Sequence, residues 1–409
     1  MRIAVWHNLN SGGGKRALYY HVKGLVERGH YVVSYCPDTV DQDFLPLSDL
    51  VEERVFPLKG KYKKKINKFK FLNSQNNILE KTEALLEHCK ECASDIMLHA
   101  FDVLLANSSS DFYISHIGRF VNIPKIIYLG EPYRYVYEAM PEFLWKAPKR
   151  EGRVSFKYIL KRIKHLYKMY WFSYLCREEF NSASSFDLIL VNSIYSKECV
   201  KRCYNLESKV CYLGIDTNKF FPNQEKNMYI IGLGLIHESK GIERAIESVS
   251  LINDQIRPKL LWIGNNKNKN LDYLEKLKKY AKERSVEIIF KTYITDLELI
   301  TCLSGAIVLL YLPNLEPFGL ALLEANACGT AVVGIGEGGV KETIKNGING
   351  FIVNEFSQEK VAEYLKLFID IDFAKEFGSK ARSYVEANWS YAMGIDNIEN
   401  YLYEIIKSK

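Results

Sequence analysis

Long hydrophobic runs are missing from this sequence of 409 residues. No segment reaches the roughly 18 consecutive apolar residues that a membrane-spanning helix requires. The N-terminus also lacks the basic start and apolar core of a signal peptide, because a short strand pattern leads directly into glycines. These absences predict a cytoplasmic protein.

Cysteine is present without the pattern that disulfides or metal sites need. The nine cysteines form no even framework, which suits a reducing compartment. Cys89-x-x-Cys92 has no second pair to complete a zinc site. The acidic pairs at 41–43 and 370–372 lie in polar or helical surroundings, away from the expected ligand site. We therefore expect no metal and no resident cofactor.

The composition is that of an ordinary globular protein, with 47% apolar and 25% charged residues. Its length suits two domains of about 150 to 200 residues each. The net charge of +6 is modest and gives no reason to expect nucleic acid, since no recognised binding module accompanies it.

Basic residues are nevertheless concentrated in two segments. Residues 59–70 contain seven lysines, and residues 146–168 contain nine Lys or Arg against the single acid Glu151, interleaved with aromatic and aliphatic residues. Basic residues on one helix face with apolar residues on the other are typical of an interfacial helix, which would place the protein peripherally at the inner membrane face. The alternative is a solvated helix whose apolar stripe packs on its own domain.

Strand and helix patterns alternate along the chain, which predicts parallel sheets covered by helices on both faces. Two series of strands are expected, at 3–6, 31–35, 103–106, 125–129, 188–191 and 210–213, and at 229–232, 259–263, 287–290, 306–310 and 331–334. The polar segment 217–227, with a central proline, is the predicted linker between them. Residues 391–409 show helical periodicity of apolar side chains.

The strongest functional signal lies in residues 315–329. Two carboxylates, Glu316 and Glu324, stand eight positions apart around a short apolar helix between two apolar strands. Charged side chains between buried strands rarely lie on a merely solvated surface and usually have a specific partner. Glu324 lies about two turns along the helix, where it can accept two hydrogen bonds from hydroxyls such as those of a ribose.

The start of this helix is the second part of the signal. Pro317 fits the first turn, and Gly329 fits just past the end. Three N–H groups then lack partners within the helix and form a site for an anion such as a diphosphate, those of Phe318, Gly319 and Leu320.

These motifs resemble the retaining glycosyltransferases of family 4, whose signature is a Glu-x7-Glu pair around Pro-Phe-Gly, then Glu-Ala-x-Ala-x-Gly and a glycine-rich turn. The resemblance continues, in the family's order, at Gly12–Gly14, 25–32, 188–193, 212–216 and Lys240-Gly241. It implies an α/β protein of the GT-B fold, with two Rossmann-like, doubly wound parallel-sheet domains facing across a cleft.

The resemblance also assigns the domains. Residues 1–216 would form the acceptor-side domain, joined by a C-terminal helix over 390–409. Residues 217–389 would form the domain that binds the nucleotide sugar.

Several residues take roles from the resemblance. Glu324 would bind the ribose hydroxyls, Leu320 the ribose-phosphate, and Ile294 the base through backbone groups. Glu316 would hold the donor sugar near its anomeric centre, and Lys240 is the cation that the family uses at the diphosphate.

The N-terminal domain contributes further candidates. Glu131 stands where the family commonly has a catalytic-side His, so it would receive the acceptor proton or bind the donor sugar; its alternative role is to cap the following segment. Gly13 and Gly14 belong to the glycine loop, which is expected at the same cleft.

One position departs from the family pattern. Most relatives have an Arg five residues before the Lys, and this chain has Leu235. Either Lys240 and backbone amides suffice, or Lys15 or Arg16 reaches in, or activity is lost. His237 is a phosphate contact or a hydrogen-bonded structural residue.

The predicted activity is therefore the retaining, metal-independent transfer of a sugar from a nucleoside diphosphate to a glycan or lipid-linked acceptor, in polysaccharide or glycoconjugate biosynthesis. We favour UDP and glucose for the donor. The alternatives are a catalytically silent nucleotide-sugar-binding subunit, and an epimerase or phosphorylase of the same fold. A dinucleotide-dependent oxidoreductase is less well supported, because Gly12–Gly14 lacks the G-x-G-x-x-G spacing.

Overall fold

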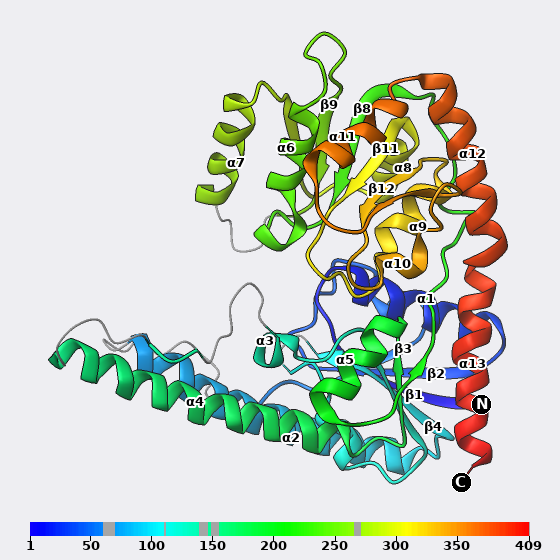
Figure 1. Cartoon of the computed structure of the whole chain (residues 1–409). Helices are drawn as coiled ribbons and strands as arrows, with labels where there is room; N and C mark the ends of the chain where they lie inside the picture. Colours follow the sequence, from blue (N-terminus) through cyan, green and yellow to red (C-terminus); the bar gives the residue numbers. More distant parts are fainter. Residues whose placement is uncertain (60–69, 110–111, 139–145, 149–154, 266–270, 409) are drawn as a thin grey trace. The chain divides into compact units, whose positions relative to one another are not determined.

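The computed structural model describes the chain except residues 60–69, 110–111, 139–145, 149–154, 266–270 and 409 (Figure 1). The chain forms two compact units, the first comprising Met1–Asn192, Ser196–Cys211 and Asn397–Lys409, and the second Ser193–Tyr195 and Tyr212–Asp396. The chain thus leaves the first unit after Cys211 and re-enters it at Asn397.

The first unit contains a parallel sheet of seven strands in the order β3-β2-β1-β4-β5-β6-β7. Its strands are β1 (Arg2–Asn8), β2 (Tyr31–Cys36), β3 (Glu52–Val55), β4 (Val103–Ser109), β5 (Lys125–Leu129), β6 (Leu188–Val191) and β7 (Lys209–Val210). Its helices are α1 (Gly13–Glu27), α2 (Lys70–Leu98), α3 (Arg134–Tyr137), α4 (Phe156–Ala183) and α5 (Ile194–Tyr204), of which α5 begins in the second unit, and a 3-10 turn, η2, covers His116–Arg119.

Both faces of this sheet are buried, as a Rossmann-like sheet requires. Along β1, Ala4 and Trp6 pack against Cys89 and Cys92 of α2. Ile3 and Val5 point to the opposite face and are equally inaccessible. The Cys89-x-x-Cys92 pair is therefore part of the core, and burial raises the pKa of both thiols. All nine cysteines are free thiols.

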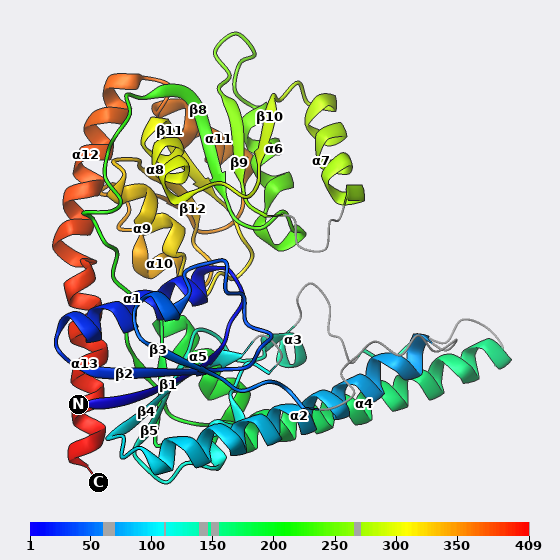
Figure 2. The ribbon, with the colours of Figure 1, turned by 180° about the vertical axis from the view of Figure 1, so that it is seen from behind.

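The second unit contains a parallel sheet of six strands in the order β10-β9-β8-β11-β12-β13 (Figure 2). Its strands are β8 (Asn227–Leu233), β9 (Lys259–Ile263), β10 (Ile288–Lys291), β11 (Ala306–Tyr311), β12 (Val332–Ile335) and β13 (Gly350–Val353). Its helices are α6 (Ile242–Ser250), α7 (Leu271–Glu283), α8 (Asp296–Gly305), α9 (Leu320–Ala327), α10 (Val340–Thr343), α11 (Gln358–Leu367) and α12 (Ile371–Asn388), and a 3-10 turn, η3, covers Glu238–Lys240.

The prediction of two Rossmann-like parallel-sheet domains is confirmed. Two strands were not predicted. β3 reads Glu-Glu-Arg-Val, and its charges are tolerated because it lies at the sheet edge. β13 is a short edge strand that begins with Gly350. The expected strand at 210–213 is reduced to the two residues of β7.

The last helix, α13 (Tyr391–Lys407), holds to the first unit by its second half. There Glu399 accepts hydrogen bonds from His30 (2.6 Å) and Arg28 (2.5 Å). Tyr401 donates to the carbonyl of Val210 at 3.0 Å, and Ile398 is fully buried. His30 therefore has a structural role in holding α13 to the first unit.

Candidate functional site

The segment between β11 and α9 differs from its prediction. Helix α9 begins at Leu320, so Pro317 lies in the preceding loop and not in the first turn. Gly319 forms the N-cap with φ 88°, and Leu315 also has a positive φ, 48°. The first N–H groups without an acceptor inside the helix are those of Leu320 and Ala321, which shifts the predicted anion site along the chain from Phe318 and Gly319.

The loop is kept out of the helix by contacts from distant residues. The Pro317 carbonyl accepts a hydrogen bond from Ser193 Oγ at 2.6 Å. The Glu316 carbonyl accepts one from the Gly339 N–H at 2.8 Å. A Cβ at Gly338 would lie 2.2 Å from the Glu316 carbonyl oxygen, so this turn needs glycine for close approach as well as for its φ of 62°. The glycine-rich turn therefore supports the Glu316 loop.

Glu316 and Lys240 lie against each other. The Nζ of Lys240 donates to Oε2 of Glu316 at 2.7 Å, and the two side chains are 24% and 18% exposed. They come from different loops of the second unit and are brought together by the fold. An ion pair that water still reaches contributes only about 0–1 kcal/mol, so a ligand can replace either partner at little cost.

Lys240 is positioned by a tight contact between its turn and the end of β11. Gly241 follows η3 with φ 71°, and a Cβ there would lie 2.0 Å from the Leu312 carbonyl oxygen. The Asn314 N–H donates to the Ser239 carbonyl at 2.9 Å. The Lys-Gly sequence thus locks the lysine turn onto the chain that leads to Glu316.

Glu324 is buried in α9, 5% exposed. Tyr311, the last residue of β11, hydrogen-bonds to Glu316 and is also within the field of Glu324. Burial and these two carboxylates raise the pKa of Tyr311 well above its ordinary value. Sequence reasoning missed Tyr311, although a tyrosine that ends a fully buried apolar strand was a usable signal.

The other predicted donor residues occupy different environments. The Phe318 ring is buried and packs against Trp389 at a centroid distance of 5.7 Å and Tyr212 at 6.4 Å, so the ring anchors the loop. Leu320 is half-buried at the start of α9. Ile294 is half-buried in the loop after β10, where Thr295 begins α8 with a capping box.

Leu235 carries no charge, so it cannot replace the arginine that the resemblance places five residues before Lys240. Arg244 of α6 lies nearby in the chain, with Nη1 3.9 Å from Glu337 Oε1 and its guanidinium over the Phe356 ring at 4.9 Å. Glu337 in turn accepts a hydrogen bond from the Leu315 N–H at 3.3 Å. Arg244 and Glu337 therefore brace the loop that carries Glu316.

His237 makes a local structural hydrogen bond, and its side chain is exposed. Its Nδ1 accepts a hydrogen bond from the Ser239 N–H at 3.2 Å and so caps η3.

In the first unit, Gly13 and Gly14 are the first two residues of α1 and are exposed, so their N–H groups are available at a helix N-terminus. Lys15 and Arg16, which the sequence offered as one of three explanations for Leu235, are both buried. Lys15 is inaccessible and donates to the Asp41 carbonyl at 2.7 Å. Burial lowers the pKa of Lys15, with the charge of Glu53 acting in the opposite direction.

Glu131 is held by Arg134. The guanidinium donates to Glu131 Oε2 through Nε at 2.9 Å and Nη2 at 2.7 Å, and also to Glu138 at 3.3 Å. Arg134 is 5% exposed, whereas Glu131 is half-buried. The N-cap of α3, Tyr133, has no side-chain cap bond of its own. The candidate proton acceptor is thus a carboxylate whose charge is shared with a buried arginine.

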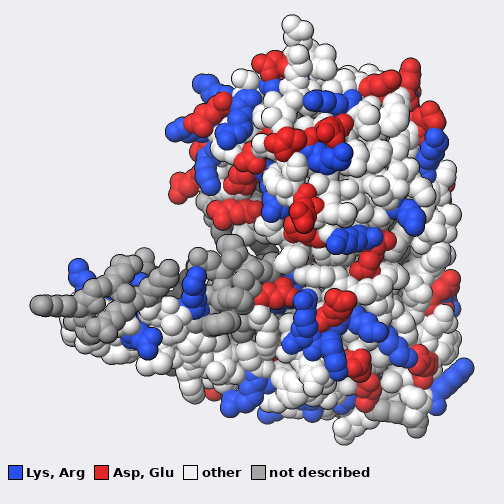
Figure 3. All heavy atoms as spheres, viewed as in Figure 1, with Lys and Arg blue, Asp and Glu red and all other residues white. Residues whose placement is uncertain are grey.

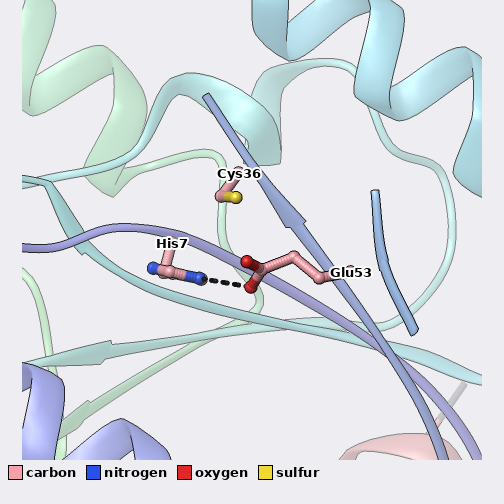
Figure 4. A group of neighbouring side chains, drawn as sticks. All are labelled: His7, Cys36 and Glu53. Atoms are coloured by element: carbon pink, nitrogen blue, oxygen red, sulfur yellow. Dashed lines mark hydrogen bonds and ion pairs between the residues drawn. The ribbon is translucent and has the colours of Figure 1, made fainter. Parts of the chain in front are cut away.

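A three-residue group on β1, β2 and β3 has the composition of a metal site (Figure 4). The ligand atoms of His7, Cys36 and Glu53 lie within 4.8 Å of one another. Glu53, however, already accepts hydrogen bonds from His7 (3.3 Å), Ser34 (3.0 Å) and Gln42 (2.7 Å).

The protonation of this group also suits an ion-pair network. Burial alone would raise the pKa of Glu53, but its hydrogen bonds from His7, Gln42 and Ser34 lower it to about 2. Burial raises the pKa of the Cys36 thiol, which keeps it protonated. Burial lowers the pKa of His7, whose buried Nδ1 has no hydrogen-bond partner among the described residues, and the charge of Glu53 acts on nearby Lys15.

The basic segments fall partly outside the described residues, since 60–69 and 149–154 are not described. Among the described helices, none is long and apolar enough to cross a membrane.

The family described as Glycosyl transferases group 1 matches residues 215–384, the region that holds Lys240, Glu316 and Glu324. The match covers 170 of the 409 residues of this chain. The observed pairing of Lys240 and Glu316 lies inside that match.

Relatives and solved structures agree with this assignment at the level of the fold. Alpha-1,3/1,6-mannosyltransferase ALG2 of Dictyostelium discoideum is 24% identical over 261 residues, which cover 54% of this chain and 61% of that protein. The chain spans about half the length of the curated relatives it matches. Sucrose-phosphate synthase from Thermosynechococcus elongatus has a TM-score of 0.73 at 16% identity, covering 100% of both chains. HepE of Anabaena, solved with UDP and glucose, has a TM-score of 0.67 at 15% identity, covering 98% and 99%.

Proposed function

We propose that this protein is a retaining glycosyltransferase that moves a sugar from a nucleoside diphosphate to a glycan or lipid-linked acceptor, in polysaccharide or glycoconjugate biosynthesis, without a divalent metal. The observation that carries the proposal is the exchangeable Lys240–Glu316 pair beside buried Glu324, within the residues matched by the family.

The chemistry follows from the charges. Negative charge develops on the diphosphate as the bond to the anomeric carbon breaks, and it must be neutralised by fixed positive groups. Lys240 and the N–H groups of Leu320 and Ala321 supply these, and the diphosphate takes Lys240 from Glu316. Glu316 then accepts hydrogen bonds from the donor sugar. Glu324 accepts those of the ribose hydroxyls, and Ile294 meets the base through its backbone.

The first unit would supply the acceptor side. Gly13 and Gly14 offer exposed N–H groups to an anion. Glu131 receives the acceptor proton or binds the donor sugar while Arg134 holds its carboxylate in place. These roles rest on the resemblance and on the local geometry of this unit alone.

For the donor we retain UDP and glucose. GDP-mannose is the competing candidate, because one similar protein is a GDP-mannose-dependent mannosyltransferase of Mycobacterium tuberculosis. Thermal shift with UDP, GDP and ADP sugars separates them, since a ligand at a hundred times its Kd adds about 2.7 kcal/mol of stability. Stabilisation by GDP-mannose alone would overturn the choice of UDP and glucose and leave the reaction class intact.

Retention and metal independence have separate tests. The anomeric configuration of the product, read by NMR, should match that of the donor, and an inverted product contradicts retention. Transfer should continue in EDTA. Activity that disappears in EDTA and returns with Mg²⁺ or Mn²⁺ contradicts metal independence.

A second candidate is a catalytically silent subunit that binds nucleotide sugars, and Leu235 favours it because the usual second cation is absent there. Slow hydrolysis of the donor in the absence of acceptor, lost in Glu316→Ala, would argue for the enzyme. Tight nucleotide binding with no hydrolysis and no transfer to any glycan or lipid-linked acceptor would argue for the subunit.

A further inference from the structure

Helix α4 has two dissimilar halves. Its second half packs on the first unit through Trp171, Leu175, Glu179 and Ser182, all of which are buried. Before Trp171 no residue of α4 is buried. Over the four turns of Phe156–Tyr170 the helix has only half-buried and exposed residues, and in Figures 1 and 2 it runs beside α2.

The exposed half nevertheless carries large apolar residues. Each is between 43% and 74% exposed: Phe156, Ile159, Leu160, Ile163, Leu166 and Tyr170, here named the α4 stripe. At about 100° per residue, these six side chains fall within an arc of roughly 120°. The spacing is that of one continuous helix face.

The stripe is not an extension of the face that packs on the core. By the same rotation, the buried residues of the second half centre about 120° from the middle of the stripe, and only buried Glu178 reaches its edge. The exposed Arg177 lies within the stripe's arc. The apolar residues of the first half thus occupy the solvent side of α4. The sequence alternative, a stripe that packs on its own domain, does not hold for the described residues.

The charge around the stripe has one sign. From Phe156 to Arg177 the sequence has six basic residues and no Asp or Glu. Arg162 and Lys164 border the stripe on its two sides, and Lys157, Lys161 and Lys168 lie beyond Lys164. Figure 3 shows blue and white surface on the outer part of α4, apart from the atoms that are not described.

From this arrangement we infer that the α4 stripe binds the surface of an anionic lipid bilayer, with its apolar residues among the acyl chains and its lysines and arginines at the phosphates. An exposed apolar arc bordered by cations is what a helix lying in a membrane interface requires. Nucleic acid or an acidic protein would account for the basic residues and leave six exposed apolar side chains without a partner. The inference goes beyond the proposed activity and does not depend on it.

The experiment is sedimentation of the full chain with vesicles, in the absence of any sugar nucleotide. Phosphatidylcholine vesicles containing phosphatidylglycerol should bind the protein, and pure phosphatidylcholine vesicles should bind it much less. Ile163→Asp with Leu166→Asp should reduce the partition coefficient at least about 10-fold for each residue, because each loses the transfer of a large apolar side chain. Lys161→Glu with Lys164→Glu should reduce binding to anionic vesicles only.

The matched control is Leu98→Asp. Leu98 is the last residue of α2, lies in the same unit and is 82% exposed. This variant should bind as the unchanged protein does. Circular dichroism and melting temperature check that each variant is folded. Equal binding by the Ile163→Asp/Leu166→Asp variant, or no binding by the unchanged protein, overturns the inference. Light scattering tests for a dimer. If the unchanged protein is a dimer and the Ile163→Asp/Leu166→Asp variant is a monomer, the stripe joins two copies of this chain and the inference is overturned.

Discussion

The two units hold their charged side chains in opposite ways. In the second unit, Lys240 and Glu316 form a pair that water reaches, at the ends of two loops. In the first unit, Lys15, His7 and Glu53 form a network that is almost fully inaccessible. A partly exposed pair can exchange a partner for a ligand, whereas a buried one leaves an uncompensated charge when a partner is lost. The difference separates residues available for chemistry from residues that maintain the fold.

Removing Glu53 tests the buried side of this comparison and should have the largest effect. Glu53→Ala removes the acceptor of His7, Ser34 and Gln42 and the main carboxylate charge acting on buried Lys15. It should lower the free energy of unfolding by about 3–5 kcal/mol, measured by denaturant titration. Glu52→Ala, on the same strand with its side chain 51% exposed, is the control and should change little.

The pH dependence of stability sharpens the same test. The folded pKa of Glu53 is lowered to about 2 from an ordinary 4.5. Its contribution is therefore fully present above pH 4.5 and is lost as the pH falls from 4.5 towards 2. Glu53→Gln should lack this part of the acid dependence. An unchanged acid profile would show that the carboxylate is not held as the structure has it.

Removing Lys240 tests the exchangeable side. Lys240→Ala should reduce the rate of sugar transfer on the order of 10²–10³-fold, because the leaving diphosphate loses its cation. The melting temperature should stay nearly constant, since the pair with Glu316 is partly exposed. Lys345→Ala, an exposed lysine of the same unit, is the control. A large loss of stability with transfer preserved would assign Lys240 to the fold.

The two carboxylates of the second unit should differ in effect. Glu324→Ala should weaken nucleotide binding by ~1.5–3 kcal/mol, because the ribose hydroxyls lose a charged acceptor. Glu316→Ala should mainly reduce turnover and nearly keep nucleotide affinity. Calorimetry with UDP or the preferred nucleotide measures both. Equal losses of affinity would contradict this division of roles.

The glycine turn provides the smallest predicted effect. Gly338→Ala places a Cβ 2.2 Å from the Glu316 carbonyl oxygen. It should lower the free energy of unfolding by about 1–3 kcal/mol and should also weaken donor binding. Gly347→Ala is matched in backbone strain, with φ 77° and no atom within 4 Å, so the difference between the variants isolates the clash. Similar losses in both would mean that the turn does not support the Glu316 loop.

Much of the fold was predictable because buried parallel strands consist of short, continuous runs of apolar residues. β5, β6 and β9 have the predicted bounds, and their residues are mostly buried. β3 was not predictable from its own residues, because Glu52, Glu53 and Arg54 read as a solvated segment. Its place is set by pairing with β2 and by the partners of Glu53, which lie far away in the chain.

The sequence named candidate residues for the site, and the structure shows a geometry that the sequence did not predict. The meeting of Lys240 and Glu316 does not follow from local patterns, and the family resemblance alone pointed to a shared site. The predicted start of α9 was wrong. Contacts of the Glu316–Pro317 loop with Ser193 and with the glycine turn hold Pro317 outside the helix, and they outweigh its preference for the first helical turn. The buried position of Lys15 was equally out of reach, since it depends on Asp41 and on the network around Glu53.

The most direct test of the central claim is a structure of the protein with a nucleoside diphosphate bound. The account predicts that the diphosphate lies within hydrogen-bonding distance of Lys240 Nζ and of the Leu320 and Ala321 N–H groups, that Glu324 accepts from the ribose, and that the 2.7 Å pair between Lys240 and Glu316 is open. Phosphates held by another Arg or Lys, with that pair intact, would contradict it.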